Sequence, residues 1–192
     1  AFANKFKDHL WKDLEDFIKM DKLVIGFCNG FQIMANLGLL PALDGKYGAR
    51  QTALLHNKNA RYLNRWVDLA PYGNSHWLKN LSEFASPIAH GEGMLYTDPK
   101  TLEQLKEKGL ISLKYVKGEI CEYQNLSPNP TGTLEDIAGI TNGNGKILGL
   151  MHHPELGMFF THLPHWTFLK EKYKRQGKKS PEFADGIRIF KN

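Results

Sequence analysis

The sequence has few cysteines and no long apolar run. Cys28 and Cys121 are its two cysteines in 192 residues, too few for a disulfide framework. Their contexts differ, which favours a reduced, cytosolic protein. No apolar stretch approaches the ~18–20 residues of a membrane span, and no signal segment stands at the N-terminus. Internal repeats and linkers are also missing. We therefore expect one domain over residues 1–192, located in the cytoplasm and without a membrane partner.

Charge of one sign is in slight excess, with 25 Lys and Arg against 20 Asp and Glu, a net +5. The excess is densest over residues 170–179, a run that could bind nucleic acid or an anionic partner. No RNA- or DNA-binding motif accompanies it. A solvated helical surface is the favoured interpretation, and no nucleic-acid partner is expected.

The hydrophobic pattern near the N-terminus predicts a helix, a strand and a second helix. Apolar residues from Phe6 to Ile18 recur at helical spacing, which indicates an amphipathic helix with one buried face. Residues 22–27 form a short apolar run with β-branched members, typical of a buried strand. Residues 30–40 return to helical spacing. This order is typical of the α/β class.

The remaining pattern predicts further strands and one surface helix. Strands are expected at residues 51–55, 61–69, 86–90, 112–116, 137–141 and 146–151, and a helix at residues 100–108. Residues 142–145, Asn-Gly-Asn-Gly, predict a hairpin between the last two strands. Residues 125–132 are expected to form a loop, and the chain after Glu155 to be aromatic and loop-like.

Residues 26–30, Gly-Phe-Cys-Asn-Gly, predict a nucleophile elbow in which Cys28 replaces the usual serine. Side chains in place of the two glycines would clash with the neighbouring strand and helix. The turn would set Cys28 at a helix N-terminus, where the dipole favours the attacking thiolate. A buried cysteine beside a packing glycine is an equally good interpretation of this segment alone.

Residues 152–155, His-His-Pro-Glu, supply the context that favours catalysis. They follow a predicted strand, so His153 and Glu155 should project toward one mouth of the sheet. There His153 could act as a base and Glu155 could orient its ring. A metal site built from His152, His153, Glu155, His162 and His165 is a weaker alternative, because standard ligand spacing is lacking. Cys121 lies between Glu119 and Glu122, whose charges would raise its pKa, and we expect it to be structural.

Several motifs together resemble the class I (triad) glutamine amidotransferases, and more narrowly the glutaminase component of phosphoribosylformylglycinamidine synthase. They are Cys-Asn-Gly-Phe-Gln at residues 28–32, Asn-Ala-Arg-Tyr-Leu-Asn-Arg-Trp-Val at 59–67, His-Gly-Glu-Gly at 90–93, Pro-Asn-Pro-Thr-Gly at 128–132, Met-His-His-Pro-Glu at 151–155 and Gly-Ile-Arg-Ile-Phe at 186–190. The similarity spans essentially the whole chain. It implies a flavodoxin-like open mixed sheet of the class I glutaminase type.

The resemblance also implies roles for particular residues. Cys28 would attack the side-chain amide of glutamine to form a thioester and release ammonia, with His153 as base and acid and Glu155 as its orienter. The backbone N–H of Asn29 would be one oxyanion donor. Candidates for substrate binding or for the synthetase-facing surface are Gln32, Arg65, His90 and Glu92. Alternatively, Arg65 is an ordinary surface charge and Gln32 a helix cap.

The resemblance implies glutamine as substrate and a synthetase subunit or domain of formylglycinamidine ribonucleotide synthase as partner. That partner would use ATP and Mg to aminate formylglycinamide ribonucleotide, so no cofactor and no metal are expected in this domain. A different cysteine hydrolase of flavodoxin-like fold is a second interpretation. A catalytically incomplete fragment, or a non-catalytic assembly subunit, is a third.

Two kinds of departure from the family pattern are visible. The family usually has Pro at the position of His152 and Arg at that of Leu156. It also has an N-terminal strand–helix–strand–helix–strand segment, whose Gly-Gly-Phe-Ser-Tyr-Gly-like loop supplies a second oxyanion N–H. At ~30 residues per βαβ unit, this segment would have roughly 60–80 residues, and they would be missing from the present sequence. Ala1 would then fall in or just before the helix that precedes the nucleophile strand.

Overall fold

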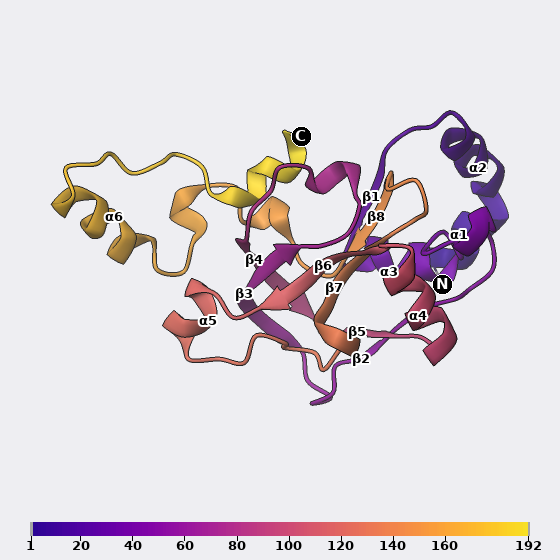
Figure 1. Ribbon diagram of the computed structural model, residues 1–192, viewed down its shortest axis with the longest axis horizontal. Coiled ribbons are helices and arrows are strands. Elements are labelled where there is room, and N and C mark those ends of the chain that lie inside the picture. Colours follow the sequence, from indigo (N-terminus) through magenta and orange to yellow (C-terminus); the bar gives the residue numbers. More distant parts are fainter. Residues whose placement is uncertain (1, 192) are drawn as a thin grey trace.

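The computed structural model describes residues 2–191, so the expected placement of Ala1 lies outside the described residues. Figure 1 shows a curled mixed sheet with helices at its sides. The helices are α1 Phe2–His9, α2 Trp11–Lys19, α3 Asn29–Asn36, α4 Pro99–Glu107, α5 Glu119–Gln124 and α6 Trp166–Arg175. The strands are β1 Val24–Phe27, β2 Ala53–His56, β3 Leu63–Pro71, β4 Phe84–His90, β5 Glu92–Tyr96, β6 Ile111–Val116, β7 Ile137–Thr141 and β8 Ile147–Leu150. The predicted α/β class with an open mixed sheet is confirmed.

The main sheet has the strand order β1-β8-β7-β6-β3-β4, and β2 pairs with β5 in a separate ribbon. Strands β1 and β8 are parallel, with Phe27 opposite Leu150, whereas the other neighbours in the main sheet are antiparallel. The carboxyl ends of parallel neighbours meet at one sheet edge, which is where sites form in open α/β sheets. The segments that follow β1 and β8 therefore emerge side by side.

Each face of the main sheet is covered by its own apolar cluster. One contains Phe31 and Met34 of α3 and Leu105 of α4, and the other contains Leu78 and Ile189 from short 3-10 helices. Ile147 and Leu148, adjacent on β8, belong to opposite clusters, as the two-residue period of a strand requires. Because both faces of β8 are buried, the strand that leads to residues 152–155 is firmly placed.

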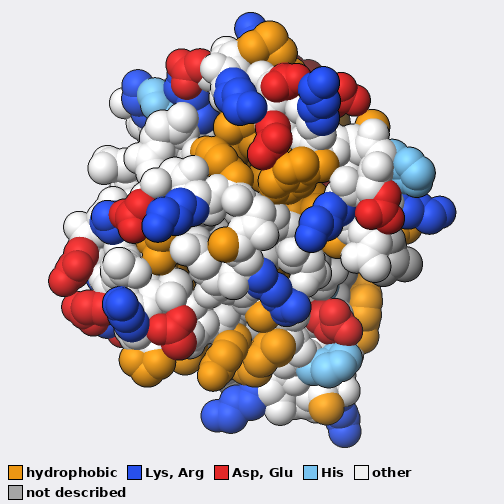
Figure 2. All heavy atoms as spheres, turned by 90° about the vertical axis from the view of Figure 1, so that its right-hand side faces the viewer, with side chains coloured by type: hydrophobic (Ala, Val, Ile, Leu, Met, Phe, Trp, Pro, Cys, Tyr) orange, Lys and Arg blue, Asp and Glu red, His pale blue; other side chains and the backbone are white. Residues whose placement is uncertain are grey.

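The N-terminal helix prediction needs correction. The structure has two short helices, with a distortion at Leu10 (φ −127°, ψ 0°). None of their residues is fully buried, although Phe6, Leu14 and Ile18 pack partly against the core. Figure 2 shows apolar side chains among Lys, Asp and Glu on this side of the molecule. Apolar residues that stay exposed on and just after these helices are Phe2, Leu10, Phe17, Met20 and Leu23.

Most other elements agree with the sequence, and the hairpin of β7 and β8 is confirmed. Strand β5 and helix α5 were not expected. The loop expected after Glu155 is wrong for residues Trp166–Arg175, which form helix α6. The helical surface expected at residues 170–179 is confirmed for residues 170–175, where it overlaps this helix. Among residues 2–191, no helix is both long and apolar enough to cross a membrane.

Gly149→Ala is expected to destabilise the protein by about 1–3 kcal/mol, the usual cost of overpacking a core. A Cβ at Gly149 on β8 would lie 2.2 Å from Cδ2 of the buried Phe31 and 2.6 Å from Cδ1 of Leu40. Urea unfolding measures the loss. Gly143→Ala is the matched control, because a Cβ there meets nothing within 4 Å. Equal unfolding midpoints for the two variants would contradict this account.

Candidate active site

Cys28 lies in a strained turn between β1 and α3. Its φ of 48° and ψ of −106° fall outside the regions that L residues normally adopt. The Cys28 N–H donates to the Leu150 carbonyl at 2.8 Å, which ties the turn to the end of β8. The residue also occupies the N-cap position of α3 without a capping hydrogen bond from its side chain, and the first-turn N–H groups there have no intrahelical acceptor. The backbone N–H of Asn29 belongs to that first turn.

The two glycines of the elbow differ in what they avoid. A Cβ at Gly26 would lie 2.8 Å from the Gly30 carbonyl carbon and 2.9 Å from the Met34 sulfur, so the predicted clash is confirmed there. A Cβ at Gly30 would meet nothing within 4 Å, and the prediction for that position is wrong. The elbow is close-packed because the Gly30 backbone lies where a side chain at residue 26 would otherwise be.

His153 and Glu155 follow β8, and the His153 ring contacts both the Cys28 thiol and the Glu155 carboxylate. The His153 Nδ1–H donates to Glu155 Oε1 at 2.6 Å, and the His153 N–H donates to the Pro87 carbonyl at 2.8 Å. Hydrogen bonding to Cys28 is the largest effect on the pKa of His153. Burial opposes it as the second-largest effect, and the hydrogen bond to Glu155 and its charge add to the rise, which brings the pKa to about 9. The structure thus brings together the three residues that the sequence proposed as a triad.

His152 has no exposed surface, and its Nδ1 lies 3.1 Å from Ser86 Oγ. Together with the backbone bridge between His152 and Ile88, this contact fixes the segment carrying His153 to β4. Burial, followed by the charges of His153 and His90, lowers the pKa of His152 to about 3. The ring is therefore neutral beside His153.

His90 is buried at the end of β4. Burial, and then the charge of His153, lowers its pKa to about 4. The ring fills the space over Gly93, where a Cβ would lie 2.1 Å from the His90 Cε1. Neither ring nitrogen has a hydrogen-bond partner among the described residues. His90 is thus a neutral, packed side chain close enough to His153 to feel its charge.

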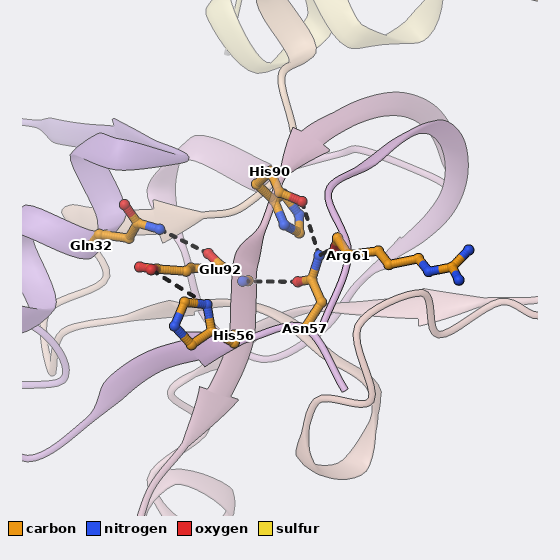
Figure 3. Close-up of polar contacts among 7 residues, drawn as sticks. Gln32, His56, Asn57, Arg61, His90 and Glu92 are labelled. Carbon is orange, nitrogen blue, oxygen red and sulfur yellow. Dashed lines mark hydrogen bonds and ion pairs between the residues drawn. The ribbon is translucent and has the colours of Figure 1, made fainter. Parts of the chain in front are cut away.

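Gln32 and Glu92 belong to a polar network shown in Figure 3. The Gln32 Nε2 donates to the Glu92 carbonyl at 2.8 Å, and the Glu92 carboxylate lies 3.5 Å from His56 Nδ1. Gln32 therefore bridges α3 to the start of β5, and the alternative interpretation of a helix cap is wrong.

Sequence reasoning missed Asn57, which holds this network together. Asn57 is 2% exposed. Its Nδ2 donates to the carbonyls of His90 and Arg61, both at 2.9 Å, and its Oδ1 accepts from the Gly93 N–H at 3.1 Å (Figure 3). These contacts join segments more than thirty residues apart. No local signal separates Asn57 from the other polar residues around it.

Arg65 on β3 ties the sheet to the loop at residues 125–132. Its Nη2 donates to the Ser127 carbonyl, while its Nε is buried without a partner among the described residues. Burial lowers the pKa of Arg65. The alternative interpretation of an ordinary surface charge is therefore wrong.

Cys121 is buried and its pKa is raised, as expected, but the predicted cause is wrong. Burial is the main cause and the Asp68 carboxylate the next, with no part from Glu119 or Glu122. Asp68 accepts from the backbone N–H groups of Gly118, Ile120 and Cys121, at 3.2, 3.1 and 2.8 Å. It therefore caps α5 from a strand distant in the sequence.

The histidines of the alternative metal site have separate neighbours. His162 packs edge-on to Phe159, and His165 lies beside Tyr123 and 3.7 Å from Glu119. Within residues 2–191, no three His, Cys, Asp or Glu side chains are grouped so that they could hold a metal ion.

The fold and the elbow at the sheet edge indicate a glutamine amidotransferase, and comparison with known families gives the same class. The CobB/CobQ-like glutamine amidotransferase domain matches residues 1–192. The chain is 43% identical over 195 residues to phosphoribosylformylglycinamidine synthase subunit PurQ of Methanococcus maripaludis, covering 100% of this chain and 72% of that relative. The PurQ subunit of Treponema denticola is 41% identical over 170 residues, with 80% of this chain and 63% of the relative covered.

A solved structure is also similar, that of PurLQS from Thermotoga maritima. Its TM-score is 0.58 at 26% sequence identity, and the match covers 93% of this chain and 63% of that chain. The chain thus belongs to the PurQ family of glutamine amidotransferases.

Proposed function

We propose that this protein hydrolyses glutamine through a thioester at Cys28 and supplies ammonia to a synthetase subunit of formylglycinamidine ribonucleotide synthase. The observation that carries the proposal is the placement of Cys28, held in a strained turn at the start of α3 with His153 and Glu155 beside it. A strained elbow exposes the nucleophile for attack. A cysteine that only filled the core would need neither the strain nor the His–Glu pair.

The chemistry follows from the charges of the three side chains. A Cys28 thiolate paired with the His153 imidazolium attacks the amide carbon, and the amide oxygen takes up negative charge. The Asn29 N–H in the first turn of α3 donates to that oxygen. The C–N bond breaks as the His153 proton passes to the departing nitrogen, which leaves as ammonia. His153 then takes a proton from water, which cleaves the thioester to glutamate and restores the thiolate.

Glu155 keeps the imidazole oriented and stabilises its charged form. The two buried histidines whose charges interact with His153 suit this role, because His90 and His152 stay neutral and place no second positive charge against it. The ammonia passes to the synthetase subunit, which uses ATP and Mg to convert formylglycinamide ribonucleotide to the amidine. The names of the PurQ relatives support this assignment of the pathway step.

Trapping of the acyl-enzyme tests the proposal. The full-length protein, mixed with its synthetase subunit and glutamine and quenched in acid, should carry a glutamyl adduct on the peptide containing Cys28. Cys121 serves as the internal control because it is buried and structural. An unmodified Cys28 under conditions that support glutamine-dependent synthesis would refute the thioester route.

A further inference from the structure

The net charge of the chain is confined to one segment, residues 166–179, which we call the basic arm. It consists of α6 and the four residues after it, and it contains one acid, Glu171, and six cations, Lys170, Lys172, Lys174, Arg175, Lys178 and Lys179. The arm therefore carries +5, the net charge of the whole chain, and the rest holds 19 cations and 19 anions. An anionic partner would be drawn to the arm rather than to the body.

The arm projects from the sheet, as Figure 1 shows for α6. No residue of α6 is fully buried, and its contact with the body includes Tyr173, which packs edge-on to Phe160 with ring centroids 6.0 Å apart. Within residues 2–191, the cations of the arm form one ion pair, between Arg175 and Glu171 at 3.0 Å. No ion pair therefore joins a described cation of the arm to the body, although Lys172 and Lys178 line a cavity that Glu83, Glu119 and Asp185 of the body also line.

Four lysines of the arm surround one hollow. Lys170 and Lys174 line it from α6, and Lys178 and Lys179 from the chain that follows, with Thr167, Glu171 and Ser180 completing its lining. The hollow has a volume of about 450 Å³. The four positive charges repel one another, and an anion bound between them would lower this electrostatic energy. The hollow is thus suited to carboxylate or phosphate groups.

The surroundings favour carboxylates presented by a protein. No aromatic ring lines the hollow, so it lacks the stacking platform of single-strand nucleic-acid sites. Cations lie on several sides of α6 rather than opposite a single apolar face, unlike helices that lie on membranes. Phe168, 57% exposed, shares a helix face with Lys172 and Arg175 at i+4 and i+7. An exposed aromatic beside arginine is typical of the buried core of protein interfaces.

We propose that the basic arm docks onto an acidic surface of the synthetase subunit, whose Asp and Glu side chains enter the lysine-lined hollow. The inference rests on the proposed function, because it names the partner to which the ammonia is delivered. A neutral body with one strongly charged projection orients the subunit as it approaches, which raises the association rate and makes it sensitive to salt.

Neutralisation of the hollow tests the proposal. The variant K170Q/K174Q/K178Q/K179Q keeps helix-compatible side chains and removes four charges. The control K5Q/K7Q/K12Q/K100Q removes four exposed charges, at the N-terminal helices and the start of α4, and has the same net charge. Affinity for the synthetase subunit, measured with full-length proteins at low and high salt, should fall about tenfold or more for the arm variant. The control should stay within about twofold of the wild type at low salt.

Basal glutamine hydrolysis by the arm variant should equal that of the wild type, since Cys28 and His153 are untouched. Equal affinities of the two variants for the synthetase subunit would overturn the proposal. It would also be overturned if the arm variant lost binding to RNA or to vesicles of anionic lipid but bound the synthetase normally. A wild-type protein that hydrolyses no glutamine even with the synthetase would instead refute the proposed function, a result separate from the binding comparison.

Discussion

Cys28→Ala is expected to abolish glutamine-dependent synthesis while leaving ammonia-dependent synthesis by the complex intact. Without the thiolate no acyl-enzyme can form, and the loss of a nucleophile costs about 10⁶-fold in turnover in comparable hydrolytic sites. The amination step belongs to the synthetase subunit, so free ammonia should bypass the defect. The measurement compares the rates with glutamine and with an ammonium salt, using the full-length protein and its partner.

The control for this variant is Cys121→Ala. Cys121 is a buried thiol held against the Asp68 cap of α5, so its loss should alter stability more than the ratio of the two activities. Equal losses of glutamine-dependent and ammonia-dependent synthesis in Cys28→Ala would refute the separation of the two half-reactions. Such a result would indicate that Cys28 supports the assembled complex rather than the chemistry.

Local sequence signals predicted the parts of the fold whose causes are local. The hairpin before β8 depends on its Asn-Gly turn, and the strain at Cys28 follows from the spacing of strand, glycine and helix. Strand β5 was missed because Gly91 and Gly93 flank its first residue, and glycine is depleted in strands. The missing side chain of Gly93 instead makes room for the His90 ring.

The rest of the site depends on contacts between distant segments. The hydrogen bonds of Asn57 to His90 and Gly93, and of Asp68 to the start of α5, join residues separated by 33 to 53 positions. Each partner is an ordinary polar residue in its own stretch of sequence. The strand order β6-β3-β4, which the periodicity does not specify, places Asp68 of β3 opposite Val116 at the end of β6. It also places His90, at the end of β4, opposite Leu63 at the start of β3.

Strand pairing also explains why the elbow and the His–Glu pair meet although 125 residues separate Cys28 from His153. Because β1 and β8 are parallel and in register from Val24 to Phe27, the residue after each strand emerges at the same edge. The Cys28 N–H continues the pairing to Leu150. The elbow motif and the His-Pro-Glu motif are each weak alone, and the parallel pair makes them a single site.

Glu155→Gln should lower the rate of glutamine hydrolysis and move the alkaline limb of its pH profile to lower pH. In the wild type the pKa of His153 is raised from 6.5 to about 9 by Cys28 and Glu155. The imidazolium that protonates the leaving ammonia is therefore present at neutral pH and is lost as the pH rises through about 9. Replacing the carboxylate by a neutral amide removes part of this stabilisation of the charged ring, so the proton is lost at lower pH.

The rate at neutral pH should fall by about 10²-fold or more, because a general acid–base group contributes about 10²–10⁴-fold and the amide no longer orients the ring. The alkaline limb reflects Cys28 and His153 together, because the two groups interact. The quantity to compare is therefore the pH dependence of kcat/KM, which reports on the free enzyme. Glu119→Gln is the matched control, since Glu119 also lies beside a histidine, His165, but away from the elbow. A limb that stays at the same pH in Glu155→Gln would show that Glu155 does not support the charged form of His153.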